Sequence, residues 1–335
     1  MSVPAPVFIH HGFFGGACCS CILVVDDSSY LVIGSVRGAC KVFSTISQLP
    51  VLTAYDDPEH RSIISVGQIK ANYLFVHIRS YGVLLLRFYK DLHDLKFETE
   101  KLLITKHYGF CRTISYSGCV YIPLYDERRS EVKENLHCQE TKNPVKIVDE
   151  HWDEQNLDIN FDDGKSRGML MSLSVIDRTG SNNKFLVCCF EEGSLALMDI
   201  RLKKLIQLAS VRAFEETILA CSVFANSIAV SSVKNVIKLY RIGESTMIHE
   251  KSVPYPSEVG GCGSLCFSPC GKFLASGYWD GSIRVHSVKS QKLRVVVDFH
   301  KDTIDFLDWH LVSGKRLLFA CCKDGSLSMW NLFKD

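Results

Sequence analysis

The chain has 335 residues, 47% of them hydrophobic, with a formal net charge of +1 and an isoelectric point of about 7.5. This hydrophobic content, spread along the whole chain, excludes a disordered scaffold and favours a large continuous core. The near-neutral net charge does not indicate a basic surface that would bind nucleic acid or acidic lipid. Since all-β folds of this length often form one domain, we expect a single domain over residues 1–335. We also expect the chain to be a monomer.

Cysteine usage and the start of the chain indicate an intracellular protein. Fifteen cysteines is an odd number, and the first residues carry neither the charged segment nor the long apolar run of a secretion signal. No apolar run approaches the roughly 20 residues that span a bilayer. In a reducing compartment we expect the thiols to be small buried side chains rather than disulfides.

The first predicted element is a short apolar strand at Val7–Ile9, and six tight turns follow it along the chain. Each turn contains a Gly or an Asn, the residues that accept a left-handed backbone most easily. An aromatic residue, a Met or a His follows five or six residues later. The turns centre on Gly38, Gly82, Gly193, Asn235, Gly281 and Gly325.

The spacing of these turns predicts the fold. Four intervals run from 42 to 46 residues, the length of one propeller blade, and the interval from Gly82 to Gly193 is 111 residues, which holds one further blade and an insertion. The pattern predicts an all-β, seven-bladed β-propeller. The last blade ends near Phe333 with three strands, so the strand at Val7–Ile9 is expected to pair with it and remove an open edge.

The further blade is predicted to use Phe110–Ser115, Cys119–Leu124 and Val145–Val148. Residues 126–164 interrupt the repeat, and seven of the fifteen residues from Asp149 to Asp163 are acidic, which favours solvated structure over core. We expect an insertion followed by an acidic edge strand with a loop. A partner-binding flap is the alternative, because long loops on rigid scaffolds often carry recognition.

The clearest copy of the repeat is Ser264–Val288, which reads as three strands. Pro269 cannot continue a sheet ladder and ends the first strand, and Asp280-Gly281 is a hairpin signal between the second and third.

Clustered cysteines raise the question of a metal site. The pairs Cys188-Cys189 and Cys321-Cys322 both end the second strand of a blade, and neither belongs to a CxxC motif. Neighbouring residues on a strand point to opposite faces, so such a pair cannot hold one zinc ion from the same face. We expect a packing role for the cysteines, and neither a metal nor a cofactor.

His300, Asp324 and Trp330 stand at related places around the last blade. A nucleophilic triad would need a Ser or Cys within reach of His300, and the spacing shows none. No Walker or dinucleotide-binding glycine motif occurs. We therefore expect a chain that is not an enzyme.

Ser264–Val288 and Lys315–Leu332 resemble WD40 repeats, in which a His, a turn Asp and a strand Trp are linked by hydrogen bonds that fasten a blade. The resemblance implies this role for His300, Asp324 and Trp330. In the repeat that contains Asp280, His286 replaces the Trp. More particularly, Tyr108–Arg112, Phe190–Ser194 and the two final blades resemble the family of guanine nucleotide-binding protein subunit beta-like protein 1, whose fungal counterpart is the ASTRA-associated protein 1.

This resemblance implies a non-catalytic adaptor of the cytoplasm and nucleus that works with a Tel-two-type cochaperone complex and the Hsp90 machinery. Its clients would be phosphatidylinositol 3-kinase-related kinases, with chromatin-remodelling assemblies as further associates. Because the first blade begins almost at once, we expect no N-terminal heptad helix of the kind by which a G-protein β subunit binds its γ partner. The rival functions are a substrate receptor of a cullin-type ubiquitin ligase and, more distantly, a propeller hydrolase.

Five residues are candidates for partner binding, since aromatic and arginine side chains often anchor interfaces. Phe110 and Arg112 match the family motif, although their strand position also allows a structural role. Trp152 lies in the acidic segment, and Tyr278 and Trp279 are expected in an exposed turn. For Trp279 the alternative is packing against the neighbouring blade.

Overall fold

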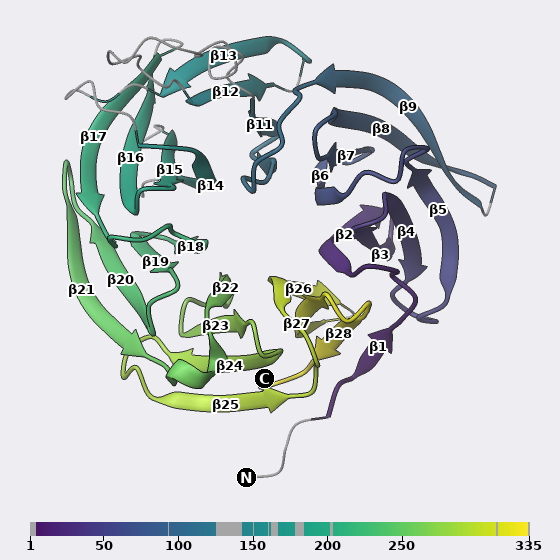
Figure 1. The fold of residues 1–335 in the computed structure, drawn as a ribbon. Helices are drawn as coiled ribbons and strands as arrows, with labels where there is room; N and C mark the ends of the chain where they lie inside the picture. The colour runs from purple at the N-terminus through teal and green to yellow at the C-terminus, as the bar shows by residue number, and fades with distance from the viewer. Residues whose placement is uncertain are drawn as a thin grey trace. The chain divides into compact units, whose positions relative to one another are not determined.

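The fold is built from seven four-stranded antiparallel sheets and one short 3-10 helix, η2 (Ser257–Val259), in the part of the chain that the structure describes (Figure 1). Seven such sheets make a seven-bladed β-propeller, as predicted. No helix in this part is long and apolar enough to cross a membrane. The structure is a computed structural model that describes residues 5–92, 94–124, 143–149, 151–159, 161, 167–177, 184–201, 204–312 and 314–333.

The chain falls into two compact units, residues 1–104 with 255–335, and residues 105–254. The expectation of a single domain stays a prediction. Unit 1 holds blades I, II, VI and VII, and the strands of each blade run in order from the first to the outermost. These strands are β2 (Ala17–Val25), β3 (Ser28–Ser35), β4 (Ala39–Ser44) and β5 (Pro50–Asp56); β6 (Ile63–Lys70), β7 (Tyr73–Ile78), β8 (Gly82–Asp91) and β9 (Asp94–Ile104); β22 (Cys262–Phe267), β23 (Phe273–Tyr278), β24 (Ser282–Ser287) and β25 (Leu293–Asp298); and β26 (Ile304–Val312), β27 (Lys315–Cys322), β28 (Leu327–Trp330) and β1 (Phe8–His10).

Unit 2 holds blades III, IV and V. Their strands are β10 (Ile114–Tyr116), β11 (Cys119–Pro123), β12 (Asn143–Val148) and β13 (Glu154–Ile159); β14 (Leu170–Asp177), β15 (Lys184–Phe190), β16 (Ser194–Arg201) and β17 (Lys204–Arg212); and β18 (Ala220–Phe224), β19 (Ser227–Ser231), β20 (Val236–Ile242) and β21 (Met247–Pro254).

Blade III is the blade predicted in the long interval between turns. Its first strand begins at Ile114 rather than Phe110, and the acidic segment supplies the edge strand β13, as expected. Lys146 of β12 forms an ion pair with Glu154 of β13 at 2.5 Å, which gives one acidic side chain of this edge a cationic partner. Most of the predicted insertion lies outside the described residues.

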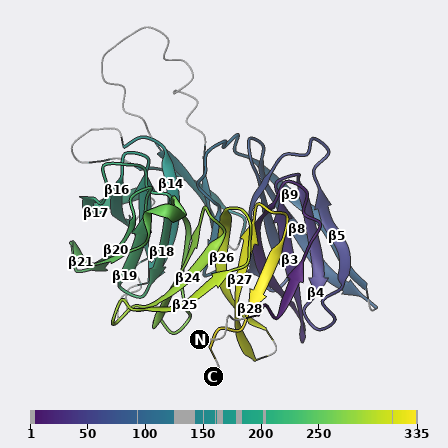
Figure 2. The same ribbon diagram turned by 60° about the horizontal axis from the view of Figure 1, so that its bottom comes forward.

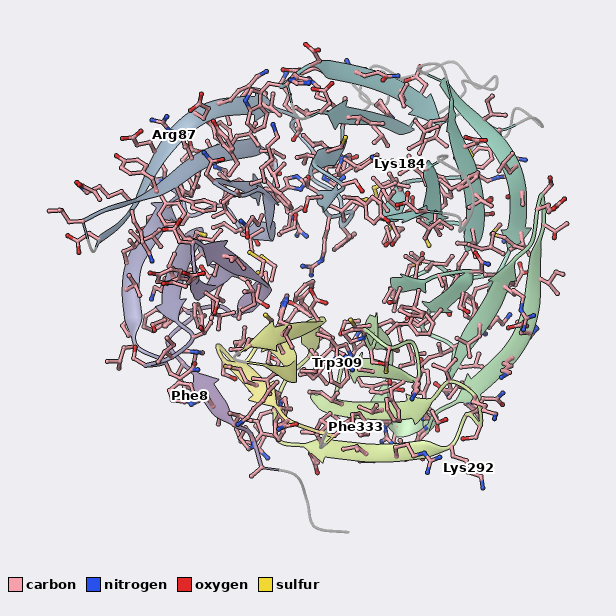
Figure 3. The ribbon with its side chains drawn as sticks, turned by 180° about the vertical axis from the view of Figure 1, so that it is seen from behind. Phe8, Arg87, Lys184, Lys292, Trp309 and Phe333 are labelled. Carbon is pink, nitrogen blue, oxygen red and sulfur yellow. The ribbon has the colours of Figure 1, made fainter. Side chains whose placement is uncertain are left out.

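Blade VII is completed by the N-terminal strand. β1 pairs antiparallel with β28, with Phe8 opposite Met329 and His10 opposite Leu327, and the Val7 amide donates to the Met329 carbonyl at 2.7 Å. Figure 2 shows β28 beside β27, and Figure 3 shows Phe8 on the outermost strand. The predicted closure of the last blade is confirmed, and it leaves β28 without an open edge.

The other end of the described chain is fixed by ring stacking. Phe333 stacks on Phe273 of blade VI with ring centroids 4.0 Å apart and planes 10° from parallel, and it lies 6.2 Å from Trp309 of blade VII (Figure 3). Both ends of the chain therefore contribute to the packing of unit 1.

Four of the six predicted turn residues have the expected left-handed backbone: Gly38, Gly193, Gly281 and Gly325 have φ between 83° and 92°. In the turn of blade II the left-handed residue is Ser80, with φ of 60°, and Gly82 begins β8. Gly82 is needed for a different reason, because a Cβ there would lie 2.3 Å from the Leu103 carbonyl oxygen.

The expectation for Asn235 is wrong in its backbone conformation. Asn235 does not have a positive φ, and the chain bends instead through a short contact in which the Val236 amide donates to the Lys234 carbonyl at 2.7 Å. The residue type allowed a left-handed turn, but this tighter bend satisfies the backbone without one.

The paired cysteines pack as predicted. Cys188 and Cys189 are fully buried in two different hydrophobic clusters, and the same is true of Cys321 and Cys322. Neighbouring thiols therefore face opposite sides of their sheets and serve as small apolar side chains.

Removing residues 1–10 should lower the free energy of unfolding by about 2 to 4 kcal/mol, because β28 loses its outer ladder and the apolar contacts of β1. Urea unfolding followed by circular dichroism measures the change. Removal of residues 1–5, which precede the strand, is the control and should leave the midpoint unchanged. Equal midpoints for the two deletions would contradict a closing role for β1.

Candidate functional site

His300, Asp324 and Trp330 are joined by hydrogen bonds through a serine that the sequence did not single out. His300 Nδ1 lies 2.9 Å from Asp324 Oδ2, and His300 Nε2 lies 2.6 Å from Ser328 Oγ. Trp330 Nε1 donates to the same Ser328 oxygen at 2.6 Å. The network joins the loop before β26, the turn after β27 and the strand β28, as predicted for residues that fasten a blade.

The order Asp324, His300, Ser328 has the composition of a nucleophilic triad, but its surroundings do not suit catalysis. Ser328 is 0% exposed, lies within β28, and its oxygen already accepts the Trp330 N–H. A nucleophile must reach its substrate, and this hydroxyl cannot. The arrangement is therefore structural.

Burial and hydrogen bonding set the protonation of this network. Burial lowers the pKa of His300 despite the opposing effect of Asp324, so the imidazole is neutral near pH 7. For Asp324 burial raises the pKa, but hydrogen bonds from Ser326 and His300 outweigh it, and the net pKa is lowered. A neutral His300 can donate to Asp324 and accept from Ser328 at the same time.

The same cluster contains a group of possible metal ligands within the described residues. Ligand atoms of His300, Cys322 and Asp324 lie within 4.8 Å of one another. Cys322 Sγ donates to the Asp302 carbonyl at 3.0 Å, and burial raises the pKa of this thiol to about 12, which disfavours the thiolate that metals bind. These ligand atoms already have partners within the protein, which favours a structural role in blade VII over metal binding. The expectation that no metal binds stays a prediction.

Ser328→Ala should lower the free energy of unfolding by about 2 to 4 kcal/mol, because it leaves two buried nitrogen atoms, of His300 and Trp330, without their partner. Urea unfolding measures this loss. Ser290→Ala, at an exposed position of the same unit, is the matched control. A Ser328→Ala chain as stable as the control would show that the network does not fasten the blade.

Blade VI carries a weaker version of this network. Asp280 Oδ1 accepts from the Ser282 amide at 2.9 Å and from the Ser282 hydroxyl at 2.7 Å, as Asp324 does with Ser326 in blade VII. His286 stands in place of the Trp, and its buried Nδ1 has no hydrogen-bond partner. Burial lowers the pKa of His286 to about 4.

The stability of the chain should therefore fall in mild acid. The unfolded chain binds a proton on the His286 position below about pH 6.5, whereas the folded chain does so only near pH 4, so the free energy of unfolding decreases as pH falls through this window. His286→Phe should reduce the loss between pH 7 and pH 5 by about 2 kcal/mol.

Urea titrations at the two pH values measure this effect. Leu311→Ala, which removes an exposed side chain without a titratable group in the same unit, is the control and should leave the acid-induced loss as it is in the natural chain. An unchanged loss in His286→Phe would rule out the buried imidazole as its source.

The two aromatic residues expected in an exposed turn have different environments. Tyr278 is 0% exposed, with its ring 4.8 Å from that of Tyr255, so its expectation as a partner-binding residue is wrong. Tyr255 stands in the segment between β21 and η2. Trp279 is 43% exposed and remains a candidate.

Trp279 lies against glycines of the loop before β22. A Cβ atom built on Gly261 would meet the indole at 2.8 Å, and one on Gly260 would meet it at 3.3 Å. The Trp279 amide donates to the Gly261 carbonyl at 3.1 Å. Trp279 is therefore partly packed and partly exposed: the glycine backbone covers part of the indole, and the rest is open to solvent.

Three candidates lie in unit 2. Phe110 is 59% exposed, Arg112 is partly buried, and both stand in the loop before β10 rather than on a strand. Trp152 is partly buried and has a φ of 66° in the turn between β12 and β13. The structure does not bring Trp152 and Trp279 into one unit, and the binding roles of all three residues stay predictions.

Sequence reasoning missed Phe14, which is 81% exposed in the loop between β1 and β2. A series of contacts within unit 1 links this loop to Trp279. The Thr303 hydroxyl donates to the Trp279 carbonyl at 3.5 Å, the Lys323 amide donates to the Thr303 carbonyl at 3.0 Å, and a Cβ on Gly16 would lie 3.0 Å from Lys323 Cα. We call the segments 12–16, 255–261, 279–282, 298–305 and 323–326, which precede the first strands or turn between the second and third strands, the loop face of unit 1.

Comparisons with known proteins agree with the fold. The family model of the anaphase-promoting complex subunit 4 WD40 domain matches residues 219–312. Guanine nucleotide-binding protein subunit beta-like protein 1 from Mus musculus is 26% identical over 169 residues, which are 50% of each chain. The match thus spans about half the length of this curated relative, and it supports a WD40 protein without establishing the family.

Solved structures are similar over the whole chain at low identity. Sqt1 from Saccharomyces cerevisiae matches with a TM-score of 0.73 and 13% identity over 100% of both chains. The computationally designed Ika8 protein matches with a TM-score of 0.60 and 14% identity over 96% of this chain and 98% of that one. These likenesses show the fold alone. WD40 propellers typically serve as scaffolds or adaptors for protein interactions.

Proposed function

We propose that this chain is a non-catalytic adaptor that assists a Tel-two-type cochaperone complex, with Hsp90, in the maturation of phosphatidylinositol 3-kinase-related kinases. The observation that carries the proposal is the partial likeness to guanine nucleotide-binding protein subunit beta-like protein 1 on a WD40-type propeller. The proposed compartments are the cytoplasm and nucleus, and chromatin-remodelling assemblies are proposed as further associates.

The blades suit an adaptor because they are rigid and carry many loops. The second strands of the blades are almost wholly buried, as in β7, where five consecutive residues are, and β15, where six are. Loops on such a scaffold can hold two partners close together and raise the effective concentration of each for the other without chemistry.

The described site chemistry favours binding over catalysis. In the arrangement of Asp324, His300 and Ser328 the hydroxyl is buried, and the arrangement fastens blade VII. The exposed aromatic residues Phe14, Phe110 and Trp279 lie in loops. Exposed aromatic side chains are frequent anchors of protein interfaces. A substrate receptor of a cullin-type ubiquitin ligase would use the same kind of surface. Only the identity of the bound partners distinguishes the two functions.

Affinity purification of the tagged full chain from cells of its source should recover cochaperone subunits together with the kinases, as measured by quantitative mass spectrometry. Removal of residues 126–142 tests whether the predicted insertion contributes to this recovery. Recovery of a cullin adaptor in place of the cochaperone subunits would contradict the proposal and support the ubiquitin-ligase receptor. Labelling by a hydrolase active-site probe that Ser328→Ala abolishes would contradict a non-catalytic role.

A further inference from the structure

The strand β1, which closes blade VII, is anchored by a buried histidine. Of its three residues, Phe8 is 37% exposed, Ile9 is half-buried and His10 is 4% exposed. The backbone of the strand pairs with β28, whereas the His10 side chain lies against blade I. The attachment of this strand therefore depends on a side chain that can take up a proton.

The His10 imidazole is enclosed by two aromatic rings and one amide. Its ring centroid lies 4.4 Å from that of Phe43 and 4.8 Å from that of Phe8, and its Nε2 lies 3.2 Å from Gln48 Oε1. A neutral imidazole suits this place, because it can donate its N–H to the Gln48 oxygen. An imidazolium there would carry its charge into an apolar site, which costs free energy unless an opposite charge lies nearby.

The neighbouring groups disfavour this charge. Burial, partly offset by the bond with Gln48 and assisted by the positive charge that His11 can carry, lowers the pKa of His10 to about 4. His11 itself is exposed, and it also acts against protonation of the buried His300 in blade VII.

The two adjoining blades supply no counterion for His10 among the described residues. On blade I, Lys41 adds a positive charge, with Nζ 5.6 Å from the centre of the Phe13 ring. On blade VII, the turn carboxylate of Asp324 is already bonded to His300 and Ser326. A protonated His10 would therefore be buried without an acidic partner.

Gly12 provides a hinge between β1 and the start of blade I. It has a φ of 88°, and a Cβ atom there would meet nothing within 4 Å. The next residue, Phe13, is 1% exposed, and its amide donates to the Gly325 carbonyl at 3.1 Å. Residues 7–10 can therefore move about Gly12 while Phe13 stays in place.

We propose that His10 makes the closure of blade VII sensitive to pH: when its imidazole takes up a proton, β1 detaches from β28 and from blade I while the rest of unit 1 stays folded. Detachment returns the imidazolium to water and leaves the backbone groups of β28 open to another strand. The proposal goes beyond the proposed function and does not depend on it.

Proton linkage gives the direction and size of the effect. In the detached strand His10 binds a proton below about pH 6.5, and in the attached strand only near pH 4, so detachment becomes more favourable as the pH falls between these values. From pH 7 to pH 5 the population with a detached strand should rise about 20-fold.

Hydrogen–deuterium exchange of the full chain at pH 7 and pH 5 measures detachment. Each exchange rate is divided by that of the unfolded peptide at the same pH, which removes the intrinsic effect of pH on exchange. The corrected rates of residues 7–10 and of the β28 amides that face β1 should rise about 20-fold, and those of β27 should change much less. An equal rise in β27 would mean that the blade opens as a whole and would overturn the proposal.

Two variants then test whether His10 is the source of the rise. His10→Phe keeps an aromatic ring without a titratable group, and His10→Gln keeps a side chain that can bond Gln48. In both, the exchange of residues 7–10 should stay slow at pH 7 and should not rise at pH 5. His286→Phe, which removes a buried imidazole from blade VI, is the matched control and should keep the rise in residues 7–10. A rise that persists in either His10 variant, or that is lost in His286→Phe, would contradict the role of His10.

Discussion

The pairing of β1 with β28 is the contact on which unit 1 depends. A blade with three strands would expose the backbone groups of β28, and a free edge of this kind invites pairing with other chains. Because the missing strand comes from the other end of the sequence, blade VII has its four strands only when β1 is in place. The loop that follows β1 then crosses to β2 over the turn of blade VII, where the Phe13 amide donates to the Gly325 carbonyl at 3.1 Å. The edge contact thus also places the exposed Phe14.

Beneath this contact, the buried polar network of blade VII fixes its turn. Ser328 accepts from Trp330 and also bonds His300, so one hydroxyl group connects a strand to a loop. Blade VI keeps the turn aspartate but has a buried imidazole at His286 whose Nδ1 has no hydrogen-bond partner. The two most regular copies of the repeat are therefore held in different ways. Blade VII is fastened by its hydrogen-bond network, whereas blade VI relies more on apolar and aromatic packing, including the contact of Tyr255 with Tyr278.

Much of the fold could be predicted from the sequence, because turn chemistry repeats at the length of a blade. Gly38, Gly281 and Gly325 mark turns that require a positive φ, and their spacing counts the blades. The backbone at Asn235 could not be predicted in this way, since a side chain that tolerates a left-handed turn does not require one. The candidate site was less accessible to sequence reasoning. Ser328 lies two residues from Trp330 and 28 from His300, so only the folded blade shows that it bonds both. The exposure of Trp279 and the burial of Tyr278 are likewise decided by neighbours from other segments, Gly260–Gly263 and Tyr255.

The central claim is that a fastened set of blades presents the loop face of unit 1 to a protein partner. Hydrogen–deuterium exchange of the chain, alone and in the complex purified with it, tests this claim most directly. We expect slower exchange on binding in residues 255–261, 279–282 and 298–305, with little change in β23 and β27, which are already buried. Protection confined to other segments, with none in these loops, would contradict it.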